Sequence, residues 1–456
     1  MQTQIFTAHK RHLGMRAPTV LAVGFALTIL VGALVLMLPV SAADGQITPF
    51  LDALFTAASA SCVTGLVTVS TAVHWSVFGK CVILLLIQIG GLGFMSVAAI
   101  ASFVLRRTIT LHERMVMSAG LNLSDGGGIV RLTRRVLFGT FIIEGTGAVL
   151  LSCRFVPHYG FPKGITMGVF HAVSAFCNAG FDLMGTPDDP FQSLIGWAED
   201  PLVNITVMAL IVLGGLGFFV WSDVWDKHSF RRLSLHPKIV LTATAGLLLF
   251  GFGWTLLFEW SNPATLGAFD TPHKLLAAAF ESVTLRTAGF NTIDLGALTG
   301  PSQAVSCLLM FIGGSPGSTA GGIKTVTAAV LVLTAISAFC GRTTVSAFGR
   351  TIAPRSIMNA VTLLMAGGVL CLVGACAIAG IEDAPFHQCL FEAVSAFGTV
   401  GVSMGLTPTL AAASRVILIV MMYMGRVGVL TLGVAVFMRR REPPRLKYPD
   451  ADVFIG

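Results

Sequence analysis

Eight long apolar segments constrain this chain more than any other feature of its sequence. They span residues 18–40, 81–105, 136–153, 201–222, 239–258, 296–341, 356–381 and 416–438. A helix needs about 20 apolar residues to cross a bilayer, and most of the segments have that length. Only 11% of the residues carry a formal charge, whereas soluble proteins have roughly 25%. The chain is therefore predicted to be a multi-pass membrane protein.

Two of the segments allow more than one interpretation. Residues 296–341 are about twice the length of one span and are rich in glycine at their middle. We expect either one broken helix there or two half-helices around a loop. Residues 18–40 end beside the small residues Ser41 and Ala42, as a cleaved signal peptide would. A signal peptide has an apolar core of only about 7–15 residues, so we interpret this segment as a span.

The positions of the charged residues predict the orientation of the spans. Basic residues gather at the N-terminus, after every second span and in the C-terminal tail, among them Lys10, Arg11, Arg16, Arg106, Arg107, Arg131, Arg134, Arg135, Arg231, Arg232, Arg342, Arg350, Arg355, Arg439, Arg440 and Arg441. The positive-inside rule places these regions and both termini in the cytoplasm. The other loops carry acids that would attract cations to the outer face, namely Asp182, Asp188, Asp189, Glu199, Asp200, Glu382 and Asp383. The sequence pI of about 9.1 then reflects topology, and we expect no nucleic-acid partner.

Four short stretches of the sequence repeat one another. Residues 55–65, 170–180, 279–289 and 391–401 align without gaps, lie at near-constant spacing between two spans, and end in glycine. The helical part of each is about ten residues, or roughly 15 Å, which is half the hydrocarbon thickness, so each stretch must enter the membrane and return. We predict an all-α membrane protein with four span–pore-helix–span repeats and pseudo-fourfold symmetry around one pore. The repeats cover residues 1–122, 123–232, 233–347 and 348–444, followed by a cytoplasmic tail, 445–456.

The loop after each short helix predicts a cation site. The C-terminal end of a helix carries about half a negative charge, and a ring of loop carbonyls replaces the water shell of a monovalent cation. Glycine permits the backbone conformation and close approach that such a loop needs. A divalent site would favour carboxylates, but the residues before the final glycines (Thr64, Ala179, Ala288 and Val400) are not acidic. This reasoning leaves the choice between potassium and sodium open.

One such stretch alone would more often be a helix ended by a glycine cap, whereas four copies favour a selectivity filter. A monovalent cation at the filter is the only metal ion that we expect. The candidate cation-binding backbone comprises Cys62, Val63, Thr64, Gly65, Cys177, Asn178, Ala179, Gly180, Arg286, Thr287, Ala288, Gly289, Gly398, Thr399, Val400 and Gly401.

The third repeat contains a candidate gate at residues 311–324, FIGGSPGSTAGGIK. Repeats one and two carry GGLGF at 90–94 and 214–218, where we expect the glycines to permit close helix packing. The longer break in the third repeat must face the pore or another helix, because no helix in lipid tolerates so many Gly and Pro residues. A kink or π-bulge is the alternative. A phosphate-binding loop is disfavoured because Ile323 interrupts the required spacing. The gate candidates are Gly313, Gly314, Ser315, Pro316, Gly317, Ser318, Thr319, Gly321, Gly322, Lys324 and Arg426.

Ionisable residues within apolar spans are usually functional. Lys324 and Arg426 are predicted to bind carbonyls of the gate loop or to form a positive barrier below the filter, with snorkelling as the alternative for Lys324. Glu144 is expected to pair with a neighbouring helix rather than to carry protons.

Several motifs together resemble one known family. They are VTGL (63–66), CNAGF (177–181), RTAGF (286–290), GTVGV (398–402), QIGGLGF (88–94), SLH (234–236) and the tail YPDADVFIG (448–456). With these motifs nearly the whole chain resembles the potassium-translocating membrane subunits of the Trk/Ktr/HKT superfamily. Eight spans without an extra N-terminal pair fit the Ktr type better than the longer TrkH type.

The resemblance implies potassium uptake across the bacterial inner membrane, a homodimer in membrane lipid, and sodium dependence in many members. It also implies a regulatory cytoplasmic ring of nucleotide-binding RCK subunits (KtrA-like), with ATP or ADP on that partner and no cofactor in this chain. Relatives often have Thr or Asn where this chain has Cys62 and Cys177. Coordination by carbonyls tolerates that change, whereas coordination by a side chain would alter the selectivity.

Two other classes compete with a channel-like transporter. A secondary symporter would couple sodium or protons to uptake through acids such as Glu144 or Asp52. A membrane-embedded enzyme would need a nucleophile–base or metal set in the spans, and the sequence offers none, since its nine cysteines include no C-x-x-C and its ten histidines no H-x-x-x-H. We therefore expect that the chain is not an enzyme.

Overall fold

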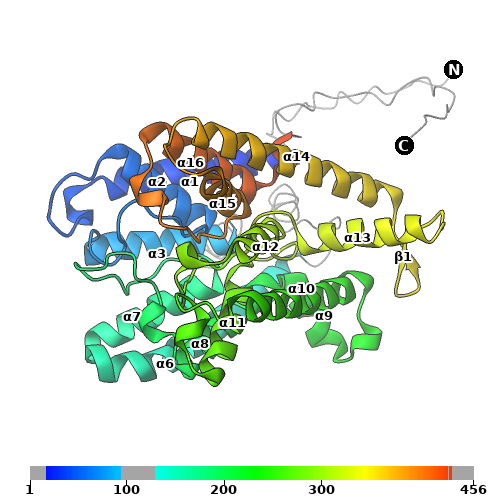
Figure 1. Cartoon of the computed structure of the whole chain (residues 1–456), viewed down its shortest axis with the longest axis horizontal. Coiled ribbons are helices and arrows are strands. Elements are labelled where there is room, and N and C mark those ends of the chain that lie inside the picture. Colours follow the sequence, from blue (N-terminus) through cyan, green and yellow to red (C-terminus); the bar gives the residue numbers. More distant parts are fainter. Residues whose placement is uncertain (1–16, 94–128, 430, 434–456) are drawn as a thin grey trace, which may run out of the picture.

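The computed structural model describes residues 17–93, 129–429 and 431–433. These residues form helices joined by loops, together with one hairpin of β1 (Ser346–Ala347) and β2 (Arg350–Thr351). Short 3-10 turns join the longer helices: η1 Pro39–Ser41, η2 Ile195–Trp197, η3 Phe230–Arg232, η4 Leu266–Ala268, η5 Leu295–Ala297 and η6 Thr407–Thr409. The predicted all-α membrane architecture is confirmed (Figure 1).

The first span of each predicted repeat is a long, unbroken helix. These helices are α1 (Ala17–Leu36), α6 (Ile129–Tyr159), α10 (Leu235–Glu259) and α14 (Pro354–Ala379), and each is long and apolar enough to cross a membrane. Large apolar side chains such as Ile142 and Leu257 are exposed on them. Such surfaces suit lipid, because hydrocarbon carries no penalty for contact with an apolar side chain.

Four shorter helices are the half-helices that the repeated stretches predict. They are α2 (Phe50–Cys62), α7 (Phe161–Phe176), α11 (Thr271–Thr284) and α15 (Phe386–Gly398), with 13 to 16 residues each. A helix of that length rises only about 20–24 Å, which is less than the hydrocarbon thickness. Their buried residues are mainly alanine, serine and phenylalanine, because small side chains let the surrounding spans approach closely.

Among the described residues, the second span is interrupted in the second, third and fourth repeats. α8 (Pro201–Gly215) and α9 (Phe218–Lys227) meet at 93°, and a loop separates α12 (Gly300–Phe311) from α13 (Thr325–Phe339). α3 (Val77–Leu92) ends before Gly93, and α16 (Ala412–Val427) ends before Gly428. The predicted division of 296–341 is confirmed. The expectation of a continuous helix over 201–222 is wrong, and residues 94–105 and 434–438 of two other predicted spans lie outside the described residues.

The glycine motifs explain the breaks. Gly93, Gly217 and Gly428 have φ values of 82°, 93° and 90°, which residues other than glycine rarely adopt. The first glycines of the two GGLGF motifs also pack tightly, as predicted, and so does Gly425 of the fourth repeat. A Cβ on Gly90 would overlap the carbonyl oxygen of Ser61, and Cβ atoms on Gly214 and Gly425 would overlap carbonyls in their own repeats. In repeats one, two and four the second span is therefore seated on the C-terminal end of the pore helix.

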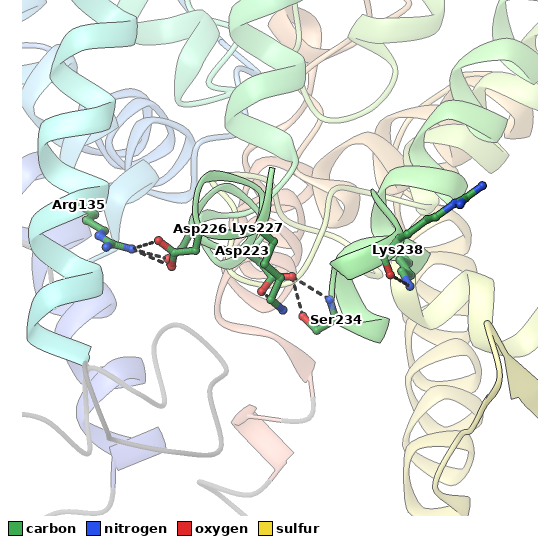
Figure 2. A network of polar contacts seen from close by, with 8 residues as sticks. Arg135, Asp223, Asp226, Lys227, Ser234 and Lys238 are labelled. Atoms are coloured by element: carbon green, nitrogen blue, oxygen red, sulfur yellow. Dashed lines mark hydrogen bonds and ion pairs between the residues drawn. The ribbon is translucent and has the colours of Figure 1, made fainter. Parts of the chain in front are cut away.

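A polar network holds the bent half of the second repeat's span in place (Figure 2). Arg135 of α6 pairs with Asp226 of α9 at 3.0 Å. Asp223 pairs with Lys227 at 2.6 Å and accepts hydrogen bonds from the backbone N–H and the hydroxyl of Ser234, both at 2.9 Å. These contacts join α9 to α6 on one side and to the start of α10 on the other.

The α13 helix packs against α10 and α14 and leads to the β1–β2 hairpin (Figure 1). Phe348, at the tip of the hairpin, lies with its ring centroid 6.1 Å from that of Phe230, and the Lys238 ammonium lies 6.0 Å from the Phe348 ring. The hairpin between repeats three and four is thus attached to the segment between repeats two and three.

Candidate functional site

The four loops after the pore helices share one unusual backbone conformation. Val63, Asn178, Thr287 and Thr399 have positive φ values of 58°, 59°, 73° and 52°. The left-handed region is costly for β-branched residues, and three of these four are β-branched. Two residues later in each loop comes the final glycine of the repeated stretch, which also has a positive φ. These glycines are Gly65, Gly180, Gly289 and Gly401. Strain that recurs at four equivalent positions is typical of a functional site.

The four glycines close a ring in sequence order. A Cβ on Gly65 would lie 2.7 Å from the Ala179 carbonyl oxygen, one on Gly180 would lie 2.9 Å from that of Ala288, and one on Gly289 would lie 2.7 Å from that of Val400. A Cβ on Gly401 would overlap the carbonyl oxygen of Thr64, which closes the circle. Four backbone carbonyls, one from each repeat, therefore converge on one shared axis, where a side chain at any of the four glycines would collide.

Hydroxyl groups on the pore helices hold these loops from behind. The Ser174 hydroxyl donates to the Phe181 carbonyl and the Ser395 hydroxyl to the Val402 carbonyl, both at 2.7 Å. In the first repeat the Gly65 N–H donates to the Ser59 hydroxyl at 3.0 Å. Sequence reasoning missed this set, although a serine six residues before the final glycine was visible in three of the four stretches.

The third repeat uses a different hydroxyl for this contact. Its hydroxyl is that of Thr284, which donates to the Phe290 carbonyl at 2.6 Å, because Val283 occupies the position of the serines. The Ala288 N–H bonds to the carbonyl four residues back, whereas the equivalent N–H of Ala179 reaches five residues back. The third loop therefore leaves its helix with a different turn, while Thr287 and Gly289 keep the positive φ values of the other repeats.

The first residue of each predicted filter segment lies in a different environment. The Cys177 thiol lies 3.6 Å from the Gln88 amide oxygen and 3.8 Å from the Glu144 carboxylate. Gln88 in turn donates to both Glu144 oxygens at 3.2 Å. Glu144 thus pairs with a neighbouring helix, as predicted, and it also touches the second filter loop. The Cys62 side chain is fully buried.

Arg286 connects the third filter loop to the candidate gate. Its guanidinium donates to the Gly313 carbonyl at 3.1 Å and to the Thr325 hydroxyl at 2.8 Å. Thr325 also donates its hydroxyl to Gly313 at 3.0 Å and its N–H to Gly314 at 2.9 Å. These contacts hold the two ends of the gate loop together, and we call this place, formed by Gly313, Gly314 and Thr325, the neck of the loop. A charged residue inside an uncharged filter motif was the sequence signal for this contact.

The candidate gate loop, residues 311–324, lies against the end of the filter at which the pore helices end. Its Gly313 and Gly321 are so close to Thr287 and Thr399 that Cβ atoms there would collide with those threonine side chains or with the loop itself. The Ser315 N–H donates to the Gly215 carbonyl at 3.0 Å, and the Phe218 N–H donates to the Gly317 carbonyl at 2.9 Å. The broken span of the second repeat therefore receives the loop of the third.

Both predicted basic residues contact carbonyls of this loop. The Arg426 guanidinium donates to the Thr319 carbonyl, to that of Gly90 at 2.5 Å and to that of Gly91 at 3.2 Å. The Lys324 ammonium donates to the Ala320 carbonyl at 2.7 Å. Lys324 occupies the N-cap position of α13 and is the last residue of the loop 311–324.

Cavities lie on both sides of the filter. A cavity of about 240 Å³ lies on the side away from the gate loop, lined by all four filter glycines. Another of about 550 Å³ lies on the side of the gate loop, and Lys324 and Arg426 line it. The ring of filter carbonyls and the gate loop thus separate the two cavities.

Four pore loops around one axis, each between two apolar helices, define a multi-pass membrane transporter. The chain belongs to the TrkH family of cation transport proteins, which matches residues 3–442.

Similar proteins cover almost the whole chain. It is 42% identical to the Ktr system potassium uptake protein B of Bacillus subtilis, over 96% of each chain. It is 40% identical to the potassium/sodium uptake protein NtpJ of Enterococcus hirae, again over 96% of each chain. The crystal structure of the potassium transporter TrkH from Vibrio parahaemolyticus has the same fold, with a TM-score of 0.72 and 17% identity over 94% of this chain and 86% of that one.

Proposed function

We propose that this chain takes up potassium across the bacterial inner membrane through the ring of filter carbonyls. The observation that carries the proposal is the closed circle in which each filter glycine meets a carbonyl of the next repeat. Carbonyl oxygens replace the water of a monovalent cation without a fixed negative charge. The names of the two bacterial uptake proteins that share about two-fifths of the sequence support potassium, with sodium as a second ion.

The loop 311–324 acts as the gate in this proposal. It lies at the inner end of the filter, and its carbonyls are held by Arg426 and Lys324. Two cations beside the ion path repel a potassium ion while the loop is in place. Opening requires that the loop leave its contacts with the broken span of the second repeat.

The remaining assignments rest on the charge pattern and the family. The termini are cytoplasmic, and the four repeats have the boundaries 1–122, 123–232, 233–347 and 348–444. The chain acts as a homodimer and binds a cytoplasmic ring of nucleotide-binding RCK subunits, with ATP or ADP on that partner and no enzymatic activity of its own. Sodium stimulates uptake.

A growth assay tests the proposal directly. Expression of this chain in a bacterium without its own potassium uptake systems is expected to restore growth at low potassium, and coexpression of an RCK subunit is expected to increase it. Flux that follows voltage, with no accumulation beyond the electrochemical gradient, is expected of a channel-like path. Accumulation above that gradient, driven by sodium or protons, would favour a symporter instead. Absence of growth with and without the RCK subunit would contradict potassium uptake.

A further inference from the structure

The outer cavity above the filter is asymmetric in charge. Each filter loop places the second residue after its glycine on the cavity wall, and these four residues are Val67, Asp182, Asn291 and Ser403. Only the second repeat supplies a carboxylate at this level. Among the described residues, Asp294 of the third repeat is the one other charged residue that lines the cavity. It is exposed, and one of its oxygens accepts the Gly296 N–H at 2.9 Å.

Asp182 is held in a defined position on this wall. Its carboxylate accepts the Met184 N–H at 3.0 Å and bonds to the Ser193 side chain. The Ser193 hydroxyl accepts the Asn291 N–H at 3.1 Å. These contacts join the segment after the second filter loop to the segment after the third. The Asp182 side chain remains on the wall of the cavity.

Apart from Asp294, the other titratable groups near the filter loops stand behind them and not in the cavity. His171 accepts the Leu183 N–H at 3.3 Å, and Glu392 accepts the hydroxyls of Ser403 and Thr407. Glu281, on the pore helix of the third repeat, is fully buried. Asp182 is therefore the one carboxylate among the four residues that stand two places after the filter glycines.

We propose that Asp182, with the oxygen-bearing side chains of Asn291 and Ser403, forms an outer site where a monovalent cation waits, partly hydrated, before it enters the filter. The proposal rests on the proposed function and adds a specific entry site to it. A single carboxylate suits this task, because it attracts a monovalent ion without binding it too tightly to leave. The same geometry makes the site sensitive to protons from outside the cell.

The charge of this group changes in a physiological range. Asp182 lies outside the spans, and its removal from water raises the pKa of its carboxyl from 3.8 to about 6. Above pH 6 the carboxylate is charged and the site attracts cations. Below pH 6 it is neutral, and the outer site loses its affinity.

The matched substitutions D182N and D188N test the site. Asparagine keeps an oxygen that accepts the Met184 N–H, so D182N removes the charge without removing the turn, and Asp188 is an exposed acid of the same loop. Rubidium uptake at external pH 7.5 is expected to need roughly tenfold more rubidium for half-saturation in D182N, as expected for one lost charge a few ångströms from the ion. D188N is expected to match the wild type.

A pH profile separates this role from a merely structural one. At low rubidium, wild-type and D188N uptake are expected to fall with a midpoint near external pH 6, the pKa of Asp182, whereas uptake by D182N stays flat. An affinity of D182N equal to that of D188N, or an unchanged acid inhibition, would overturn the inference while leaving potassium uptake intact. Absence of rubidium and sodium uptake by the wild type would overturn the inference together with the proposed function.

Discussion

The Arg426 guanidinium donates to the backbone carbonyl of Thr319, a residue 107 positions earlier in the chain. The same guanidinium reaches Gly90 and Gly91, so one side chain of the fourth repeat joins the gate loop of the third to the end of α3 in the first. Thr319 also donates its hydroxyl to the Phe176 carbonyl at 3.2 Å, at the end of the second pore helix. Arg426 and Thr319 together thus join all four repeats.

Replacing Arg426 with glutamine is expected to open the gate more often. The substitution removes a cation beside the ion path and weakens charge-assisted bonds, each of about 1.5–3 kcal/mol, which corresponds to about tenfold or more in the open population. Rubidium uptake by proteoliposomes without a regulatory subunit measures this. An R415Q variant, which alters the outer ion pair of Arg415 with Asp52, serves as the control. Unchanged uptake rate and unchanged potassium affinity in R426Q would refute a role for Arg426 in gating.

Gly401→Ala is expected to abolish uptake, and Gly405→Ala provides a matched control. The two glycines have nearly the same φ, 91° and 90°, so both substitutions carry the same backbone strain. Only the new Cβ at 401 collides with the Thr64 carbonyl, whereas nothing lies within 4 Å of one at 405. Loss of rubidium uptake by more than about tenfold in G401A alone is the expected result. Equal losses in both variants would show that strain, and not the carbonyl ring, is responsible.

Thr325→Val is expected to loosen the neck of the gate loop. Valine has the shape of threonine but cannot accept from Arg286 or donate to Gly313, so a buried cation loses a partner at a cost of about 1–3 kcal/mol. The melting temperature of the purified protein in detergent is expected to fall. The control is Thr334→Val, whose hydroxyl bonds only within α13, to Val330, and whose melting temperature is expected to stay near that of the wild type.

Glu144→Leu is expected to lower the selectivity of the filter. The substitution removes the acceptor of the Gln88 amide and the polar contact of the Cys177 thiol, both next to the second filter loop. We expect the ratio of rubidium to sodium uptake to fall by roughly threefold or more, because a loop without its support tolerates a smaller ion. Thr146→Val, on the exposed face of the same helix, controls for changes in α6. An unchanged ratio in E144L would assign Glu144 a purely structural role.

The sequence alone predicted four repeats, four pore loops and a broken span in the third repeat. These features depend on local properties: apolar length sets the spans, and a short helix that ends in glycine sets each loop. The family followed from the same motifs. The contacts of Arg426 and Lys324 with gate-loop carbonyls match the expectation from buried charge, while their role in gating stays a prediction.

Only the tertiary structure decided how these parts meet. The GGLGF motif at 214–218 permits the bend between α8 and α9, but no window of the sequence reports that the gate loop of another repeat bonds to this bend. The role of Thr284 was hidden because Val283 occupies the position where the other three repeats carry serine. The ring of carbonyls needs all four repeats at once, and the side chain of Arg286 turns from the filter to Gly313 because its charge needs oxygen partners that only the folded chain brings near.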